Sequence, residues 1–290
     1  MCDDLTAHEE DAALAAKGMS RREFAAVGAA AVIAGCAGTD GNAKAPATRE
    51  SIVTIDTPDG KADCFFVRPS RGKAPGVIMW PDIAGLRDAY KTMGRRLAQA
   101  GYAVLVVNQY YRSSPAPIMA TMSEWRTREG QAKLGPMIAA ISPEGTTRDA
   151  AAFVGWLDKQ SAVDAKRKIG SNGYCMGGPM TVRTAAAVPS RVGAAASFHG
   201  ANMVNDRPDS PHRLLAATQA SYLVAIARGD DARAPGDKDT LRAAADAAHR
   251  PAEIEVYPAE HGWCTLDAPV YDQAQADRAW SRMLALFKGL

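Results

Sequence analysis

The sequence predicts an α/β fold in which a mostly parallel central sheet carries helices on both faces. Apolar runs of strand length alternate with helix-prone stretches along most of the chain, which is the element order of such a sheet. The chain has 290 residues, of which 47% are hydrophobic. The roughly 250 residues beyond an N-terminal segment of distinct composition suit one core of this kind. We therefore expect a single domain over residues 51–290.

The expected elements begin with a hairpin. Residues 53–55 and 64–67 are strand-like and flank Pro58-Asp59-Gly60, which is a turn signal. Six further strands, separated by helical stretches, are expected at 77–80, 103–107, the run before 175, 193–197, 222–227 and 254–257. Residues 113–148 are richer in Pro, Met and polar residues, and we expect them to form a cap over a pocket.

A nucleophile elbow is predicted between the strand before Cys175 and the helix-prone stretch 179–187. The segment 173–178 reads Gly-Tyr-Cys-Met-Gly-Gly, the G-x-S-x-G pattern with sulfur in place of the hydroxyl. Its tight turn requires residues without bulk two positions either side of the nucleophile. The N-terminus of the following helix lowers the pKa of a thiol and favours the thiolate. The alternative is a buried structural cysteine on a glycine-rich turn.

Two later strands end in residues that complete a triad. An α/β-hydrolase carries nucleophile, acid and histidine in that order, each after a strand. The run 222–227 leads to Asp230 and Asp231, and the run 254–257 leads to His261. We expect His261 to be the base, because it is third in order and lies in a loop. His199 could line the pocket, but it precedes the acid and is in the wrong order for the base.

These segments resemble the dienelactone hydrolase family of α/β-hydrolases, which use a Cys-Asp-His triad. The resemblance runs from about residue 51 to the C-terminus. It is carried by Gly-Tyr-Cys-x-Gly-Gly at 173–178, Gly-Asp-Asp at 229–231 with Pro235 following, Glu-His-Gly at 260–262, and segments 75–78, 82–86, 96–98 and 101–102. The resemblance implies hydrolysis of a small-molecule carboxylic ester or lactone through a thioacyl-enzyme, with no cofactor.

The resemblance also assigns the triad residue by residue. Cys175 would be the nucleophile and His261 the base. Asp231 would be the acid in preference to Asp230, because its distance to Pro235 fits the family pattern better.

Further site residues follow from the same resemblance. The backbone N–H groups of Met176 and Ile83 would form the oxyanion hole. Asp82 stands where the family often has a glutamate that partners the resting thiol; being shorter, Asp82 could instead bind its own loop backbone. Arg112 matches one of two arginines that hold a substrate carboxylate, and the position of the second has none. Arg112 and Trp263 are therefore candidates for the pocket wall.

The N-terminus resembles a twin-arginine export signal. Arg21-Arg22 precedes an uncharged, Ala- and Val-rich core at 25–34 that is too short to span a membrane. Ile-Ala-Gly-Cys, ending at Cys36, fits a bacterial lipobox, and plain signal-peptidase cleavage is the alternative. We expect residues 1–36 to be the signal and 37–50 a flexible tether. The product would then be exported to the periplasm, or anchored to a membrane facing it through a lipid on Cys36.

Composition argues against several other functions. The net charge is only +2 and the basic residues are dispersed, so no nucleic-acid partner is expected. No spacing resembles a zinc site and no glycine-rich phosphate loop is present, so we expect neither metal nor cofactor. Two alternatives to the hydrolase remain. One is a non-catalytic exported binding protein that keeps the fold. The other is a thiol redox protein using Cys175 and Cys264, which the absence of a CxxC motif disfavours.

Overall fold

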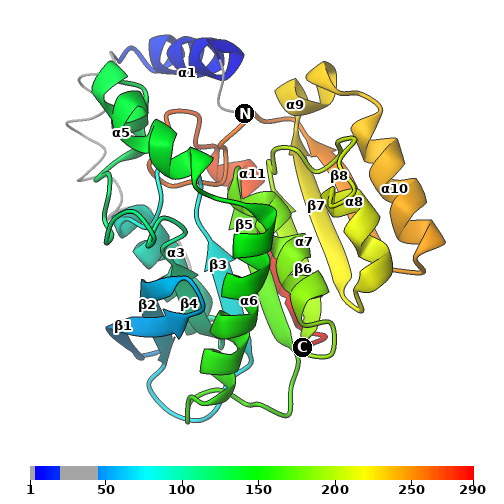
Figure 1. The fold of residues 1–290 in the computed structure, drawn as a ribbon. Coiled ribbons are helices and arrows are strands. Elements are labelled where there is room, and N and C mark those ends of the chain that lie inside the picture. Colours follow the sequence, from blue (N-terminus) through cyan, green and yellow to red (C-terminus); the bar gives the residue numbers. More distant parts are fainter. Residues whose placement is uncertain (1–3, 20–44) are drawn as a thin grey trace.

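A computed structural model describes residues 4–19 and 45–290. Within these residues, eight strands form one sheet in the order β1-β2-β4-β3-β5-β6-β7-β8 (Figure 1). The strands are β1 (Thr48–Thr57), β2 (Gly60–Pro69), β3 (Gly76–Trp80), β4 (Ala103–Val107), β5 (Ile169–Tyr174), β6 (Val192–Phe198), β7 (Ser221–Ala227) and β8 (Ala252–Tyr257). β2 runs antiparallel to β1 and β4, and every other pair is parallel.

This sheet confirms the predicted α/β-hydrolase fold, and each predicted strand is present. β3, β4 and β5 are buried along their whole length, as expected for parallel strands covered on both faces. The hairpin strands are longer than the sequence pattern indicated. β1 begins at Thr48, so the sheet starts inside the segment 37–50 that was expected to be a tether.

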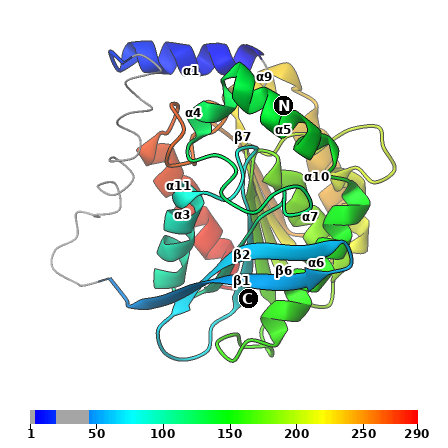
Figure 2. The same ribbon diagram turned by 60° about the vertical axis from the view of Figure 1, so that its left-hand side comes forward.

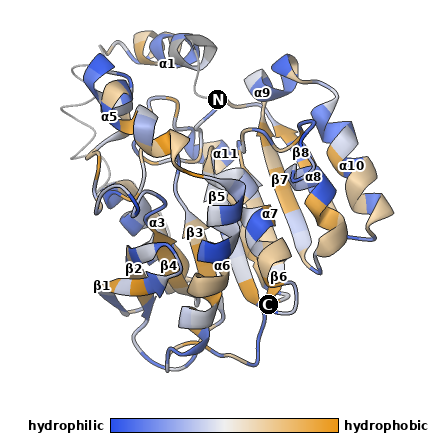
Figure 3. Ribbon diagram, in the orientation of Figure 1, coloured by the Kyte–Doolittle hydropathy of each residue, from blue (hydrophilic) through white to orange (hydrophobic). Residues whose placement is uncertain are grey.

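Helices cover both faces of the sheet (Figures 1 and 2). Residues of α3 (Asp88–Gln99) and α11 (Gln273–Phe287) pack into the core on one face. The core on the other face takes residues of α6 (Pro143–Asp158), α7 (Gly177–Ala187) and α10 (Asp237–Ala247). In Figure 3 the central strands are mostly orange, and blue residues lie on the outer helices. Burying one stripe of each helix against the apolar strands stabilises both layers.

The predicted cap, residues 113–148, contains α4 (Met122–Trp125), α5 (Arg128–Ala139) and the beginning of α6. Side chains of this segment, with those of two sheet-edge loops, form a separate apolar cluster made of Ile83, Ala84, Tyr110, Ile118, Met119, Met122, Trp125 and Leu134. The cap is therefore packed onto the loops that follow β3 and β4. Short helices also follow β6 and β7, namely α8 (Pro211–Leu214), η1 (Leu215–Ala217) and α9 (Arg228–Arg233).

A further helix, α1 (Asp4–Ala16), lies across the end of the molecule where α4, α5 and α9 are found (Figures 1 and 2). It falls within the segment predicted to be an export signal. Arg21, Arg22 and Cys36 of that prediction lie outside the described residues. Among the helices of the described ranges, none has the length and apolar character to cross a membrane.

Candidate active site

Cys175 sits on the predicted elbow, between the end of β5 and the start of α7. Its φ is +52°, in the left-handed region that a non-glycine residue enters only where the surrounding structure imposes it. A Cβ added at Gly173 would lie 2.1 Å from the Gly177 carbonyl oxygen, and one at Gly177 would lie 2.3 Å from the Trp80 carbonyl oxygen. The two glycines therefore permit the turn that holds Cys175, as the pattern predicted.

His199 supports the backbone of the elbow. The Cys175 N–H donates to the Phe198 carbonyl at 3.0 Å and approaches His199 Nδ1 at 3.1 Å. The pKa of His199 is well below its usual value, because the ring is buried and lies near His261. A neutral ring fits a role for Nδ1 as a hydrogen-bond acceptor. The rings of His199 and His261 pack edge to face at 4.8 Å between centroids.

His261 is paired with Asp230, which corrects the expectation that Asp231 is the acid. His261 Nδ1 and Asp230 Oδ2 are 2.7 Å apart. The carboxylate of Asp231 instead accepts a hydrogen bond from Lys238 Nζ at 2.6 Å. The reason is local: α9 begins at Arg228, directly after β7, and successive helical residues point about 100° apart. One step along the chain therefore moves a carboxylate from the histidine to the lysine.

The surroundings of Asp230 favour its ionised form. Burial acts to raise the pKa of its carboxyl, but the hydrogen bond from His261 and the nearby positive charges outweigh it, and the pKa is lowered overall. Arg233 also forms an ion pair with Asp230. A carboxylate in this position can hold the imidazole in one orientation and stabilise its protonated form.

The backbone amides of Met176 and Ile83, predicted to form the oxyanion hole, lie in two neighbouring loops. Among the described residues, no acceptor is found for either N–H. Tyr110 ties the two loops together, because its hydroxyl donates to the Ile83 carbonyl at 2.7 Å and lies 3.9 Å from Met176 Sδ. Amides without an internal acceptor, held on packed loops, suit an oxyanion hole.

Asp82 belongs to a buried charged cluster. Arg87, which is fully buried, donates to Asp82 Oδ1 at 2.7 Å and to Asp267 Oδ1 at 2.7 Å. The backbone N–H of Ala84 also donates to Asp82 Oδ1, at 2.9 Å, so the loop hydrogen bond considered from the sequence is present. Sequence reasoning missed Arg87 and Asp267, because nothing local signals that a charged side chain will be buried against partners far away in the chain.

Two of the predicted pocket residues lie elsewhere. Arg112 forms ion pairs with Asp149 at 2.7 Å and with Asp59 at 2.5 Å, and it joins the hairpin turn to α6. Trp263 is fully buried; its ring stacks on Tyr257 and meets His199 edge to face, both at 5.2 Å. Neither Arg112 nor Trp263 lines the pocket that contains Cys175.

The pocket that contains Cys175, called the catalytic pocket below, is small. Its lining residues are Glu10, Asp82, Met122, Cys175, His199, His261, Gly262, Thr265 and Ala268. They come from α1, the cap and the loops at the carboxyl ends of the strands. The volume is about 10 Å³, which is room for about one water molecule. Cys175 and His261 therefore share one pocket, which holds no space for a substrate in this state.

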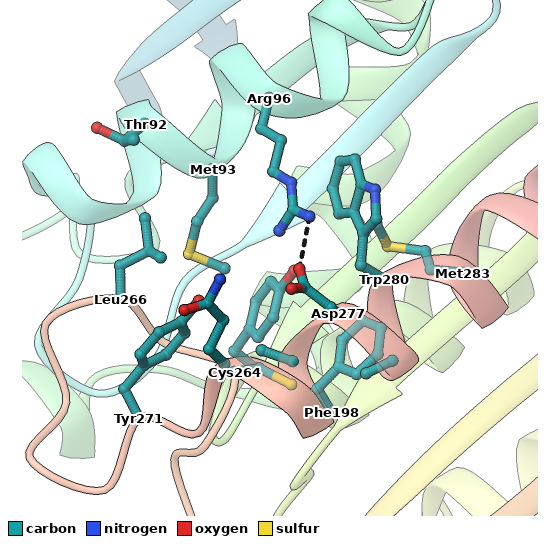
Figure 4. A pocket seen from close by; sticks show the side chains of 14 residues that line it. Thr92, Met93, Arg96, Phe198, Cys264, Leu266, Tyr271, Asp277, Trp280 and Met283 are labelled. Carbon is teal, nitrogen blue, oxygen red and sulfur yellow. Dashed lines mark hydrogen bonds and ion pairs between the residues drawn. The ribbon is translucent and has the colours of Figure 1, made fainter. Parts of the chain in front are cut away.

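A larger pocket of about 200 Å³ lies beside it, between α3 and α11 (Figure 4). Cys264, Tyr174 and Phe198 line it, and the ion pair of Arg96 with Asp277, at 2.8 Å, crosses one side. Burial raises the pKa of the Cys264 thiol well above its usual value. Cys264 and Cys175 thus line different pockets, and the described cysteines are all free thiols. Nor do the described ranges contain a group of three or more His, Cys, Asp or Glu side chains arranged for a metal ion.

Comparison with known proteins gives consistent matches. The model of the "Dienelactone hydrolase family" matches residues 62–290. The "Putative carboxymethylenebutenolidase" of Salmonella typhi is 28% identical over 242 residues, covering 81% of this chain and 86% of that protein. The protein of the same name from Escherichia coli (strain K12) is 27% identical over 243 residues, covering 82% and 86%.

Among solved structures, the chain is similar to the "Putative Dienelactone Hydrolase" from Klebsiella pneumoniae subsp. pneumoniae. The TM-score is 0.73 at 24% identity, and the match covers 84% of this chain and all of that one. At this identity the likeness concerns the fold.

Proposed function

Because the chain belongs to the dienelactone hydrolase family, we propose that it hydrolyses a carboxylic ester or lactone through a thioacyl-enzyme formed on Cys175. The observation that carries the proposal is the convergence of three features. Cys175 lies on a strained elbow, it shares a pocket with His261, and His261 is hydrogen-bonded to Asp230. The relatives named carboxymethylenebutenolidases support a lactone or ester as the substrate class.

In the first half-reaction, His261 takes the proton of the Cys175 thiol, and the thiolate attacks the carbonyl carbon. A C–S bond forms while the carbonyl electron pair moves to oxygen, where the amides of Met176 and Ile83 receive the negative charge. Removing one donor of this kind typically costs about 10² to 10³ in rate. The C–O bond then breaks, and the protonated His261 gives its proton to the leaving alkoxide. Asp230 holds the imidazole throughout.

In the second half-reaction, His261 deprotonates a water molecule that attacks the thioester. The tetrahedral intermediate expels the Cys175 thiolate, which His261 reprotonates, and the carboxylic acid leaves. With a lactone, the alcohol released in the first half-reaction stays attached to the acyl group, so the product is a single hydroxy acid.

The test is turnover and acyl-adduct formation with panels of aryl esters, lactones and thioesters. Cys175→Ala should abolish both hydrolysis and the adduct detected by mass spectrometry. Cys264→Ala is the matched control, since this buried cysteine lines the other pocket, and it should keep both. Wild-type turnover in Cys175→Ala would contradict the proposed mechanism.

We also propose that residues 1–36 direct export and that Cys36 is lipidated. The support is the Arg21-Arg22 pair, the short uncharged core at 25–34 and the lipobox-like residues that end at Cys36. An exported enzyme would meet small esters or lactones outside the cytoplasm, and a lipidated one would do so at a membrane surface.

A further inference from the structure

A carboxylate from the N-terminal helix α1 lies in the catalytic pocket. Glu10 lines this pocket together with Cys175 and His261, and only 4% of it is exposed. An acidic side chain buried to this extent needs a partner.

Arg126 holds the Glu10 carboxylate in place. Arg126, the C-cap residue that follows α4, donates from Nε to Glu10 Oε2 and from Nη2 to Glu10 Oε1, both at 2.7 Å. This bidentate geometry is the strong form of the arginine–carboxylate pair. Both side chains are nearly excluded from solvent. The contact therefore joins α1 to the cap directly at the site.

Further contacts of α1, and of Lys17 in the turn that follows it, hold the helix at the same end of the molecule (Figure 2). Leu14 is buried, and Lys17 Nζ donates to the Pro269 carbonyl at 2.9 Å, one residue after the pocket-lining Ala268. On the other side, Glu9 lies 3.8 Å from Arg233 of α9. A Cβ at Gly229 would come within 2.3 Å of Glu9 Oε1, so this glycine permits the close approach. α1 thus contacts the cap, α9 and the loop after His261.

With α1 in place, the catalytic pocket is too small for an ester. Its volume is about 10 Å³, whereas sites for small molecules usually enclose about 300–1,000 Å³. Since Glu10 forms part of the wall of the catalytic pocket, moving α1 away would expose Cys175 and His261 together.

We propose that α1 is an intramolecular inhibitor: the Glu10 carboxylate, held by Arg126, closes the catalytic pocket, and substrate reaches Cys175 only after α1 leaves. The inference rests on the proposed function, because that function makes the pocket of Cys175 and His261 the place where substrate reacts. α1 lies within the predicted export signal, so removal of residues 1–36 would open the enzyme at the moment of export. The chain would be held inactive before that step.

The first test measures access to Cys175 without requiring any hydrolysis. The full chain is treated with iodoacetamide, and alkylation of each cysteine is followed by peptide mass spectrometry. Glu10→Ala and Leu14→Asp should raise the rate at Cys175 at least about tenfold, since destabilising the closed state by about 1.4 kcal/mol raises the open population tenfold. Glu50→Ala is the matched control, because Glu50 also forms a bidentate ion pair, with Arg95 at 2.7 and 2.9 Å, away from the pocket.

Unfolding is distinguished from opening by the other cysteines. Cys64 is buried in β2 and Cys264 is buried beside α11. A misfolded variant would therefore be alkylated at Cys64, Cys175 and Cys264 alike. Labelling confined to Cys175 marks local opening. Equal Cys175 rates in Glu10→Ala, Leu14→Asp and Glu50→Ala would overturn the inference.

The second test removes α1 from the folded full chain. A protease recognition sequence is inserted after residue 36, the purified protein is cut, and α1 is separated by gel filtration. Alkylation of Cys175 and hydrolysis of an aryl acetate should both rise. A synthetic peptide of residues 1–19 should restore inhibition, and the same peptide with Glu10→Ala should not. Faster alkylation without hydrolysis would support closure by α1 and contradict the hydrolase, whereas unchanged alkylation after loss of α1 would refute closure itself.

Discussion

Asp230 and Asp231 show how much of the proposed chemistry depends on one residue. Both follow β7 and both carry a carboxylate, yet one contacts His261 and the other contacts Lys238. The sequence predicts an acid at this place, because the strand 222–227 and the triad order of nucleophile, acid and histidine can both be recognised in it. It could not choose between the neighbours, because the choice depends on where α9 begins its first turn.

This difference predicts unequal effects of two matched substitutions. Asp230→Asn should lower kcat by about 10⁴, as loss of the orienting acid does in a serine triad. Asp231→Asn should change kcat little, since it removes only a partly exposed ion pair with Lys238. Initial rates with an aryl acetate on both variants, prepared in the same state as the parent, measure the effect. A large loss in Asp231→Asn alone would return the acid to that position.

At the scale of elements, the strand–elbow–helix unit is the part of the site that sequence predicts best. A residue in the left-handed region between a buried strand and a helix requires glycine on both sides, and these glycines can be recognised in the sequence. The cluster of Asp82, Arg87 and Asp267 is invisible at this level, because its members come from loops far apart in the chain. The ion pairs of Arg112 with Asp59 and Asp149 are hidden at this level for the same reason.

The elbow glycines predict a contrast between two Gly→Ala variants. Gly173→Ala puts a Cβ 2.1 Å from a backbone carbonyl, so it should destabilise the protein by about 3 kcal/mol or more and displace Cys175. Gly155→Ala, in α6, meets nothing within 4 Å and should stabilise the protein by up to about 1 kcal/mol through helix propensity. Urea unfolding measures both. Equal stability of the two variants would show that the turn tolerates a Cβ.

The ion pairs of Asp59, in the hairpin turn, with Arg112 and with Arg148 of α6 predict that the stability of the protein depends on pH. Hydrogen bonds from Arg148 and Arg112 lower the pKa of Asp59 to about 2 from its usual 3.8. A carboxyl with a lowered pKa contributes stability that is complete above the unfolded pKa and is lost as the pH falls through the folded one. The parent should therefore be more stable than Asp59→Asn at neutral pH, with the difference shrinking between about pH 4 and pH 2. The urea midpoints of both proteins, measured across this pH range, test the prediction. A stability difference that does not change with pH would contradict a lowered pKa of Asp59.

For the whole molecule, the sequence predicted the sheet, its covering helices and the end at which the site lies, because buried parallel strands and strand-end loops carry strong local patterns. It did not predict that α1 would fold back over that site. Contacts such as Glu10 with Arg126 join the two ends of a long chain segment and leave no periodic signal. We therefore propose two roles for the N-terminal segment: it directs export, and its helix α1 closes the catalytic pocket.

Export is expected to depend on the Arg21-Arg22 pair. A receptor reads the twin arginines as an address and not as structure. Replacing Arg21 and Arg22 with Lys should therefore retain a folded chain in the bacterial cytoplasm, with α1 still present and Cys175 slow to alkylate. The parent should be exported and lose its leader, and its Cys175 should react faster.

Fractionation then separates the two modes of export. One acyl chain holds a protein weakly and several hold it firmly, so a lipidated parent should sediment with membranes while Cys36→Ala should not. N-terminal sequencing of each fraction identifies the cleavage site. A soluble product that begins near residue 37 would contradict lipidation and keep export, whereas an intact N-terminus found only in the cytoplasm would contradict both. In that last case α1 would stay on the enzyme, and opening of the pocket would require a different trigger from cleavage.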